Sequence, residues 1–142
     1  MVKVGINGFG RMGRLALRAA WGREEIEFVA INEPNAPAET MALLLEFDSV
    51  QGRFSQTCSG AGESLSVGDF ALKFTQHEKP RDIPWRESGV DLVLECSGQF
   101  RTSATIKPHF ERGARRVVVS APVKDGPPNI VVGVNHAQYD LA

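Results

Sequence analysis

The 142-residue chain has little of what marks several protein classes. Its two cysteines, Cys58 and Cys96, fit no disulfide or metal-ligand spacing, so neither a disulfide scaffold nor a metal site is expected. Its 16 basic and 17 acidic residues give a formal net charge of −1, which argues against nucleic-acid and membrane partners. No apolar run could span a bilayer, and a strand expected from residue 3 leaves no room for a signal peptide. A cytoplasmic location is therefore expected.

What the sequence does contain is an alternation of apolar, strand-like runs with helical segments. Strands are expected at residues 3–7, 27–32, 90–95, 116–120 and 130–134. Helices are expected at residues 10–21, at residues 37–46, and between the strands at 90–95 and 116–120, this last helix being broken near Pro108. Such alternation predicts βαβ units, and continuous apolar strands are typical of parallel sheets covered on both faces. The predicted fold is α/β, doubly wound, with a mainly parallel sheet.

Three local patterns add detail to this prediction. Residues 65–74 alternate in polarity around Gly68 and Asp69, which predicts a small antiparallel hairpin, whereas residues 48–54 are expected to form a loop. The first helix is expected to pack on the sheet through one apolar face, formed by Met12, Leu15, Ala16, Ala19 and Ala20. The whole chain, residues 1–142, is expected to form one domain.

A glycine-rich turn follows the first strand and opens the first helix. Residues 8–13 read Gly-Phe-Gly-Arg-Met-Gly, which matches the dinucleotide-binding pattern in the context that it requires. In that pattern Gly8 permits the tight turn, Gly10 lets the backbone approach a pyrophosphate, and Gly13 lets helix and strand pack closely. The helix N-terminus then offers free N–H groups and a partial positive charge to the phosphates.

An acidic residue completes the dinucleotide pattern at the end of the second strand. Glu33 follows Gly13 by 20 residues, the spacing at which a carboxylate accepts hydrogen bonds from the adenosine ribose. The same carboxylate would repel a 2′-phosphate by about 4 kcal/mol at about 4 Å and an effective dielectric near 20. That repulsion corresponds to roughly three decades of affinity. The sequence therefore predicts NAD, rather than NADP, as the cofactor.

Six stretches extend well beyond a generic dinucleotide pattern. Residues 4–14 (Val-Gly-Ile-Asn-Gly-Phe-Gly-Arg-Met-Gly-Arg) resemble the opening of glyceraldehyde-3-phosphate dehydrogenases almost letter for letter. Matches to the same family follow in the right order at residues 30–33, 47–54, 89–98, 117–122 and 133–135. The chain thus resembles the N-terminal, NAD-binding part of that family over essentially its whole length.

This resemblance implies a set of cofactor contacts and a chemistry. It implies pyrophosphate contacts at Gly8, Gly10, Arg11 and Met12, ribose contacts at Asn32 and Glu33, and contacts towards the nicotinamide at Ser97, Gly98, Phe100 and Ser120. The family oxidises an aldehyde through a cysteine thioester that phosphate then takes up. It further implies a small phosphorylated aldehyde as substrate and a homo-oligomer for the full-length protein.

Departures from the usual family pattern suggest a subgroup. Glu33 stands where most members carry Asp, Ser97 where Thr is commoner, and His77-Glu78-Lys79 where a basic residue often lies near the adenine. Glu33, residues 95–98 and residues 122–124 resemble members encoded with arsenate-resistance genes, in which arsenate replaces phosphate. Residues 31–33, His77-Glu78 and residues 84–87 are also similar to erythrose-4-phosphate dehydrogenases. The preferred aldehyde and the acyl acceptor stay open.

The family's catalytic segments are not expected within this sequence. The nucleophile of the family lies in a Ser-x-Cys-Thr-Thr-Asn segment shortly after the Gly-Val-Asn match, and its histidine base lies further on, whereas the sequence ends at Leu141-Ala142. Cys58 is expected in a polar loop and Cys96 as a small packed residue at a strand end. His77, His109 and His136 are expected to be solvated. The chain is therefore expected to bind NAD without turnover, with the catalytic domain lying outside it.

Other classes of protein remain as alternatives. The chain could act as a stand-alone NAD-binding module or sensor. An aspartate-semialdehyde or homoserine dehydrogenase would share the opening fold, but the run Asn7-Gly8-Phe9-Gly10-Arg11 and the Asp48-Ser49 pair argue against it. Nucleic-acid binding through the same groove finds little support in a near-neutral chain.

Overall fold

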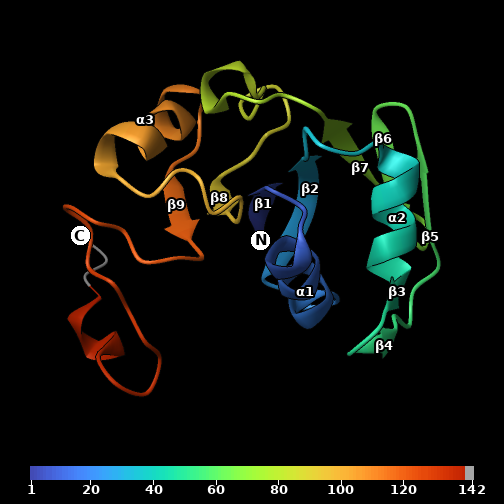
Figure 1. The fold of residues 1–142 in the computed structure, drawn as a ribbon, viewed down its shortest axis with the longest axis horizontal. Helices are drawn as coiled ribbons and strands as arrows, with labels where there is room; N and C mark the ends of the chain where they lie inside the picture. The colour runs from blue at the N-terminus through green and yellow to red at the C-terminus, as the bar shows by residue number, and fades with distance from the viewer. Residues whose placement is uncertain (140–142) are drawn as a thin grey trace.

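A computed structural model describes residues 1–139 and places most of the strands in one twisted sheet (Figure 1). The strands are β1 Val2–Asn7, β2 Ile26–Asn32, β3 Phe47–Asp48, β4 Gly52–Arg53, β5 Cys58–Ala61, β6 Ser64–Val67, β7 Phe70–Thr75, β8 Leu92–Glu95 and β9 Arg116–Val119. The helices are α1 Arg11–Ala20, α2 Ala38–Glu46 and α3 Ser103–Glu111, with short 3-10 turns η1 Pro80–Asp82 and η2 His136–Gln138. Seven strands form the main sheet, and β3 pairs with β4 separately.

The strand order of the main sheet is β5-β6-β7-β2-β1-β8-β9. The five neighbouring strands β7, β2, β1, β8 and β9 are parallel to one another. Strands β6 and β5 extend the sheet beyond β7 with antiparallel pairing. From the central strand β1 the chain crosses to β2 on one side and later to β8 on the other. This order confirms the predicted doubly wound α/β class, and the predicted hairpin of residues 65–74 belongs to the main sheet.

The core lies on both faces of the sheet because successive side chains of a strand point to opposite faces. In β2, Ile31 belongs to a large apolar cluster with Leu17 of α1 and Leu45 of α2. Its neighbour Ala30 belongs to a second cluster that is centred on Trp85. Covered on both faces, the central strands are apolar almost throughout, as parallel strands require.

Helix α1 packs through a different face from the one predicted. Gly13 and Leu17 are its buried residues, whereas Met12, which was assigned to the core face, is 55% exposed. Gly13 must face the sheet because a Cβ there would lie 2.3 Å from the Gly8 carbonyl oxygen. The tight contact at Gly13 thus sets the rotation of the helix. The predicted face of residues 12, 15, 16, 19 and 20 is left half-buried or exposed, although Ala20 still packs against the core.

Three other predictions were wrong or incomplete. Residues 48–54 are not only a loop, because Phe47–Asp48 and Gly52–Arg53 pair as a small antiparallel ladder. Helix α3 is not broken near Pro108 and continues to Glu111, since the one bond that proline cannot make would go to the carbonyl of Ala104, an exposed residue. Strand β5 was not predicted, and Cys58 lies in it rather than in a loop.

The predicted strand at residues 130–134 is also wrong. These residues form no strand, and a 3-10 turn at His136–Gln138 follows them. A strand needs a hydrogen-bonded neighbour, and the segment instead turns back on itself through bonds from Val134 and Asn135 to the Val131 carbonyl. Figure 1 shows the chain after β9 running away from the sheet. No helix among residues 1–139 is long and apolar enough to cross a membrane.

Candidate cofactor site

A cavity of about 200 Å³ opens at the carboxyl ends of β1, β2 and β8. It is lined by Asn7, Gly8, Gly10, Glu33, Pro34, Asn35, His77, Glu78, Cys96, Ser97, Gln99 and Phe100. These residues follow three neighbouring parallel strands, with His77 and Glu78 added from beyond β7. In doubly wound sheets, ligands bind outside the carboxyl ends where the strand order reverses, and β1 and β8 flank that point here.

The structural reason for glycine differs among the three glycine positions of the turn. Gly8 has a φ of +88°, and a Cβ there would lie 2.5 Å from the Ser97 nitrogen, so packing and backbone conformation both demand glycine. Gly13 is required by its contact with the Gly8 carbonyl. Gly10 has a φ of −68°, and a Cβ there would meet no atom of the described residues within 4 Å. Packing within residues 1–139 therefore gives no reason for Gly10, and open space lies in front of it.

The N-terminus of α1 adjoins that open space. Among the described residues no side chain caps its first turn, and the first turn holds no acidic residue. Backbone N–H groups in such a position, together with the helix dipole, suit a phosphate group. The open Gly10 and the uncapped helix therefore fit the pyrophosphate of a dinucleotide.

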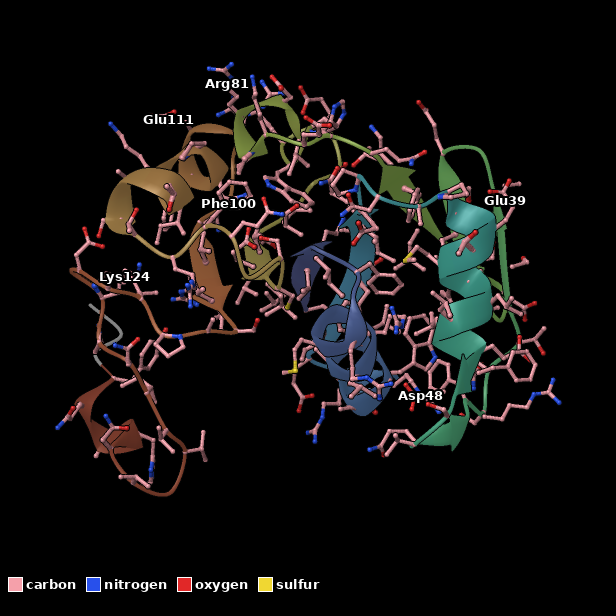
Figure 2. The ribbon with its side chains drawn as sticks, viewed as in Figure 1. Glu39, Asp48, Arg81, Phe100, Glu111 and Lys124 are labelled. Carbon is pink, nitrogen blue, oxygen red and sulfur yellow. The ribbon has the colours of Figure 1, made fainter. Side chains whose placement is uncertain are left out.

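The side chains of Arg11 and Met12 do not line the cavity. A guanidinium nitrogen of Arg11 lies 3.2 Å from an Asp48 carboxylate oxygen. Backbone N–H groups of Gln51 and Val50 hold the pKa of Asp48 below its ordinary value, and Arg11 contributes to this shift. Figure 2 labels Asp48, beside the lower end of α2.

Glu33 is buried and ties the turn to the end of β2. One carboxylate oxygen accepts the Phe9 backbone N–H at 2.8 Å, and the other accepts both the backbone and the side-chain N–H of Asn35. A carboxylate can accept about four hydrogen bonds, so acceptor capacity remains for a sugar hydroxyl. Glu33 therefore sets the shape of the cavity besides offering it a negative charge.

Asn32 lies one position earlier and does not line the cavity. It is 1% exposed, and its side chain bonds to the Asn7 side chain, to Thr75 and to both backbone groups of His77. These contacts fix the segment after β7, which brings His77 and Glu78 to the cavity wall. Asn32 thus shapes the site through its neighbours.

The residues predicted on the nicotinamide side divide between two cavities. Ser97 and Phe100 line the cavity at the glycine turn, and Figure 2 labels Phe100 above β8. Gly98, with a φ of +73°, lies in the turn between them. Ser120 lines a separate apolar cavity of about 640 Å³ between β9 and residues 121–139. Ser120 directly follows β9, and its backbone N–H donates to the Glu95 carbonyl at 3.0 Å, next to Cys96, which lines the first cavity.

Sequence reasoning missed a buried polar network under the cavity floor. His109, which was predicted to be solvated, is fully buried, and its ring bonds to Glu95 at 2.8 Å and to Trp85 at 2.9 Å. Asn7 also bonds to Glu95, at 2.6 Å. The prediction for His109 was wrong because only the fold brings β8, α3 and Trp85 together. A signal existed in the polar residues Asn7, Asn32 and Glu95, each of which stands at the carboxyl end of a mainly apolar strand.

The two cysteines are not prepared for nucleophilic attack. Burial raises the pKa of Cys58 to about 11. Burial also raises the pKa of Cys96, an effect that the nearby Ser120 side chain opposes in part. Both thiols therefore stay protonated at neutral pH, and a protonated thiol is a poor nucleophile. Within residues 1–139 no group of three or more histidine, cysteine or acidic residues could hold a metal ion.

Comparison with known proteins decides the family. The family model described as "Glyceraldehyde 3-phosphate dehydrogenase, NAD binding domain" matches residues 2–103. The chain belongs to this family. Its relatives include glyceraldehyde-3-phosphate dehydrogenase 3 of Nostoc sp., which is 55% identical over 98% of this chain and 41% of its own length. The cytosolic glyceraldehyde-3-phosphate dehydrogenase of Leishmania mexicana is 47% identical over 98% of this chain and 42% of its own length.

Membership in this family confirms the resemblance that the sequence motifs indicated. The chain is an NAD-binding domain of the glyceraldehyde-3-phosphate dehydrogenase family, NAD is its cofactor, and the family is one of oxidoreductases. The chain spans about two fifths of the length of the curated relatives that it matches.

Proposed function

We propose that this chain holds NAD for a phosphorylating glyceraldehyde-3-phosphate dehydrogenase-like enzyme. The observation that carries the proposal is Gly10, which no packing within residues 1–139 requires and which lies beside an uncapped helix N-terminus. The free space and the free N–H groups suit a pyrophosphate. A cavity of about 200 Å³ encloses only part of a dinucleotide, so the remainder lies along the surface and the affinity of the isolated chain is modest.

Each predicted site residue has a role in this proposal. Gly8 and Gly13 shape the turn, and the backbone of Gly10, Arg11 and Met12 receives the pyrophosphate. Glu33 accepts hydrogen bonds from the adenosine ribose, and Asn32 holds the segment beside it. Ser97, Gly98, Phe100 and Ser120 contact the cofactor on the nicotinamide side.

The reaction itself needs groups beyond those described. When bound, NAD would supply the hydride acceptor for oxidation of an aldehyde held on a cysteine, and phosphate or arsenate would release the resulting acyl group from that cysteine. The raised pKa values of Cys58 and Cys96 argue against either as the nucleophile. We therefore assign residues 1–142 to cofactor binding, without turnover, and assign nucleophile and base to a separate catalytic domain.

We also propose a location and an assembly for the whole enzyme. The printed name of the Leishmania mexicana relative includes "cytosolic", which supports a cytoplasmic location. A small phosphorylated aldehyde is the proposed substrate of the whole enzyme, and association of copies is supported by exposed apolar residues such as Val132 and Val134.

Calorimetric titration of the purified chain with NAD and with NADP tests the proposal. We expect micromolar to millimolar NAD binding, much weaker NADP binding, and a smaller difference between the two in a Glu33→Ala variant, because the variant removes the charge that repels the 2′-phosphate. A folded chain that binds neither nucleotide would contradict the proposal. Equal binding of both by the wild type would contradict the role of Glu33.

A further inference from the structure

We propose that Asp48 is a positioning residue that holds the Arg11 side chain away from the phosphates of the cofactor. The phosphates are then bound by backbone N–H groups rather than by a guanidinium group. This inference rests on the proposed function and adds a control of affinity to it. Arg11 is the first residue of α1 and directly follows Gly10, so its side chain starts beside the proposed phosphate position. An unrestrained arginine there would be drawn to a phosphate, with which it forms strong charge-assisted hydrogen bonds.

The backbone of its own hairpin turn fixes Asp48, the last residue of β3. The carboxylate oxygen Oδ1 accepts the backbone N–H groups of Gln51 and Val50, each at 2.8 Å. The same two bonds hold the pKa of Asp48 below its ordinary value, so the carboxylate is ionised at neutral pH. Its side chain is 4% exposed. Asp48 is therefore an anion whose place does not depend on Arg11.

Arg11 reaches this fixed anion through one guanidinium nitrogen. Arg11 Nη1 lies 3.3 Å from Asp48 Oδ1 and 3.2 Å from Asp48 Oδ2, so it contacts both oxygens of the carboxylate. An ion pair at a surface contributes little when two long side chains must both be ordered. Here only one must be ordered, because the backbone already holds the other. Since the Arg11 side chain is 50% exposed, loss of the Asp48 charge would free it to turn towards another anion.

The other arginine near the start of α1 is also held by the protein. Arg14 Nη1 donates to the Phe9 carbonyl at 3.0 Å. Burial lowers the pKa of Arg14, and the positive charge of Arg11 lowers it further, whereas Asp48 opposes the shift. The two guanidinium groups thus repel each other, and Asp48 offsets that repulsion. Neither arginine lines the cavity at the glycine turn.

The consequence is a phosphate site that lacks an arginine clamp. Backbone N–H groups and the helix dipole attract phosphate, but a charge-assisted hydrogen bond is roughly twice as strong as one between neutral groups. By withholding Arg11, Asp48 keeps the affinity for the phosphates low. In the proposed function the cofactor must leave after each hydride transfer, and a weaker hold on its phosphates favours that release.

A double-mutant cycle with three ligands separates this role from a structural one. Asp48→Asn keeps an oxygen for the two backbone N–H groups and removes only the charge. We expect this variant to bind NAD and ADP about fivefold more tightly than the wild type at low ionic strength. Adenosine has no phosphate, so its affinity, measured by NMR titration, should not change. In an Arg11→Ala background the same Asp48→Asn change should alter ADP affinity by less than about twofold, because the guanidinium group is missing.

Asp69→Asn is the matched control for the loss of one negative charge. Asp69 is exposed and lies before the start of β7, at the opposite end of the parallel strands from the cavity. Its substitution should leave ADP affinity unchanged. The gain in Asp48→Asn should shrink in about 1 M salt, where the Debye length is about 3 Å. No gain, an equal gain in the Arg11→Ala background, or a gain for adenosine would overturn the inference.

A measurement on the wild type keeps the inference testable if Asp48→Asn does not fold. In ¹⁵N NMR the guanidinium group of Arg11 should show restricted rotation, and this restriction should persist when ADP is added. Free rotation without ligand, or a transfer of the group to the phosphates on adding ADP, would overturn the inference. If the wild type binds neither NAD nor ADP, the proposed function fails, while the spectrum without ligand still tests the hold of Asp48 on Arg11.

Discussion

Two glycines of the same turn are expected to respond in opposite ways to an added methyl group. At Gly10 the methyl group enters open space, so Gly10→Ala should change the free energy of unfolding by less than about 1 kcal/mol and yet weaken NAD binding. At Gly13 the methyl group would lie 2.3 Å from the Gly8 carbonyl, so Gly13→Ala should destabilise the fold itself. Thermal unfolding together with calorimetry checks both. A Gly10→Ala variant that binds NAD with wild-type affinity would contradict the proposed role of Gly10 in pyrophosphate binding.

A second residue-scale prediction concerns the pH dependence of stability at Glu46. The Cys58 backbone N–H and the Arg53 guanidinium lower the pKa of Glu46 below its ordinary value of 4.5. The resulting stabilisation is complete above the ordinary pKa and is lost as the pH falls through the lowered one. Glu46→Gln should therefore lower the melting temperature at neutral pH, and its difference from the wild type should shrink in acid.

Melting curves between about pH 7 and about pH 3 measure this difference. Asp48 also has a lowered pKa, but it is present in both proteins, so subtraction removes its contribution. A gap between wild type and variant that does not change with pH would show that Glu46 stabilises the fold through packing rather than through its charge.

Among the elements, α3 offers the clearest prediction because two threonines at its N-terminus cap each other reciprocally. The Thr102 side chain accepts the Thr105 backbone N–H, and the Thr105 side chain accepts the Thr102 backbone N–H. Loss of one such cap costs about 1 kcal/mol. Thr102→Ala should lower the free energy of unfolding by about that amount in chemical denaturation. Thr102→Ser, which keeps the oxygen, should stay close to the wild type.

The long elements were predictable from the sequence, whereas their contacts were not. Strands β1 and β2 and helices α1 and α2 could be expected from the alternation of apolar runs with helical segments. The dinucleotide pattern also predicted that the glycine turn would lie at the cavity. Periodicity gave the wrong packing face for α1, because the close approach of Gly13 to Gly8, which periodicity cannot reveal, decides which face packs. Nor could it find β5, whose sequence Cys-Ser-Gly-Ala has little strand preference and is held by pairing with β6.

The site shows the same division between local and distant information. Glu33 was identified because the dinucleotide pattern fixes its spacing from the glycines. The burial of His109 was missed, since its partners Glu95 and Trp85 lie 14 and 24 residues away and meet it only in the folded sheet. Residues 130–134 resemble a strand in composition, but a strand exists only with a neighbour to pair with.

At the scale of the whole molecule, exposed apolar residues predict self-association. Val132 and Val134 are 87% and 80% exposed, and they lie in the segment beyond the edge strand β9. Exposed apolar surface favours association as concentration rises. Sedimentation velocity over a range of concentrations should show oligomers that a Val132→Lys, Val134→Lys variant reduces. Unchanged sedimentation of that double variant would place the association surface elsewhere.

The central position of β1 also constrains how the domain is made. Val4 pairs with Phe28 on one side and with Leu92 on the other, so β1 is synthesised before both of its neighbours and gains the second one only when β8 has been made. At about 5–20 residues per second, the ribosome needs roughly 3 to 12 s to add the roughly 60 residues between β2 and β8. During those seconds an apolar strand edge stays open. The nascent chain is therefore most exposed to wrong pairing, and most dependent on chaperones, between the synthesis of β2 and that of β8.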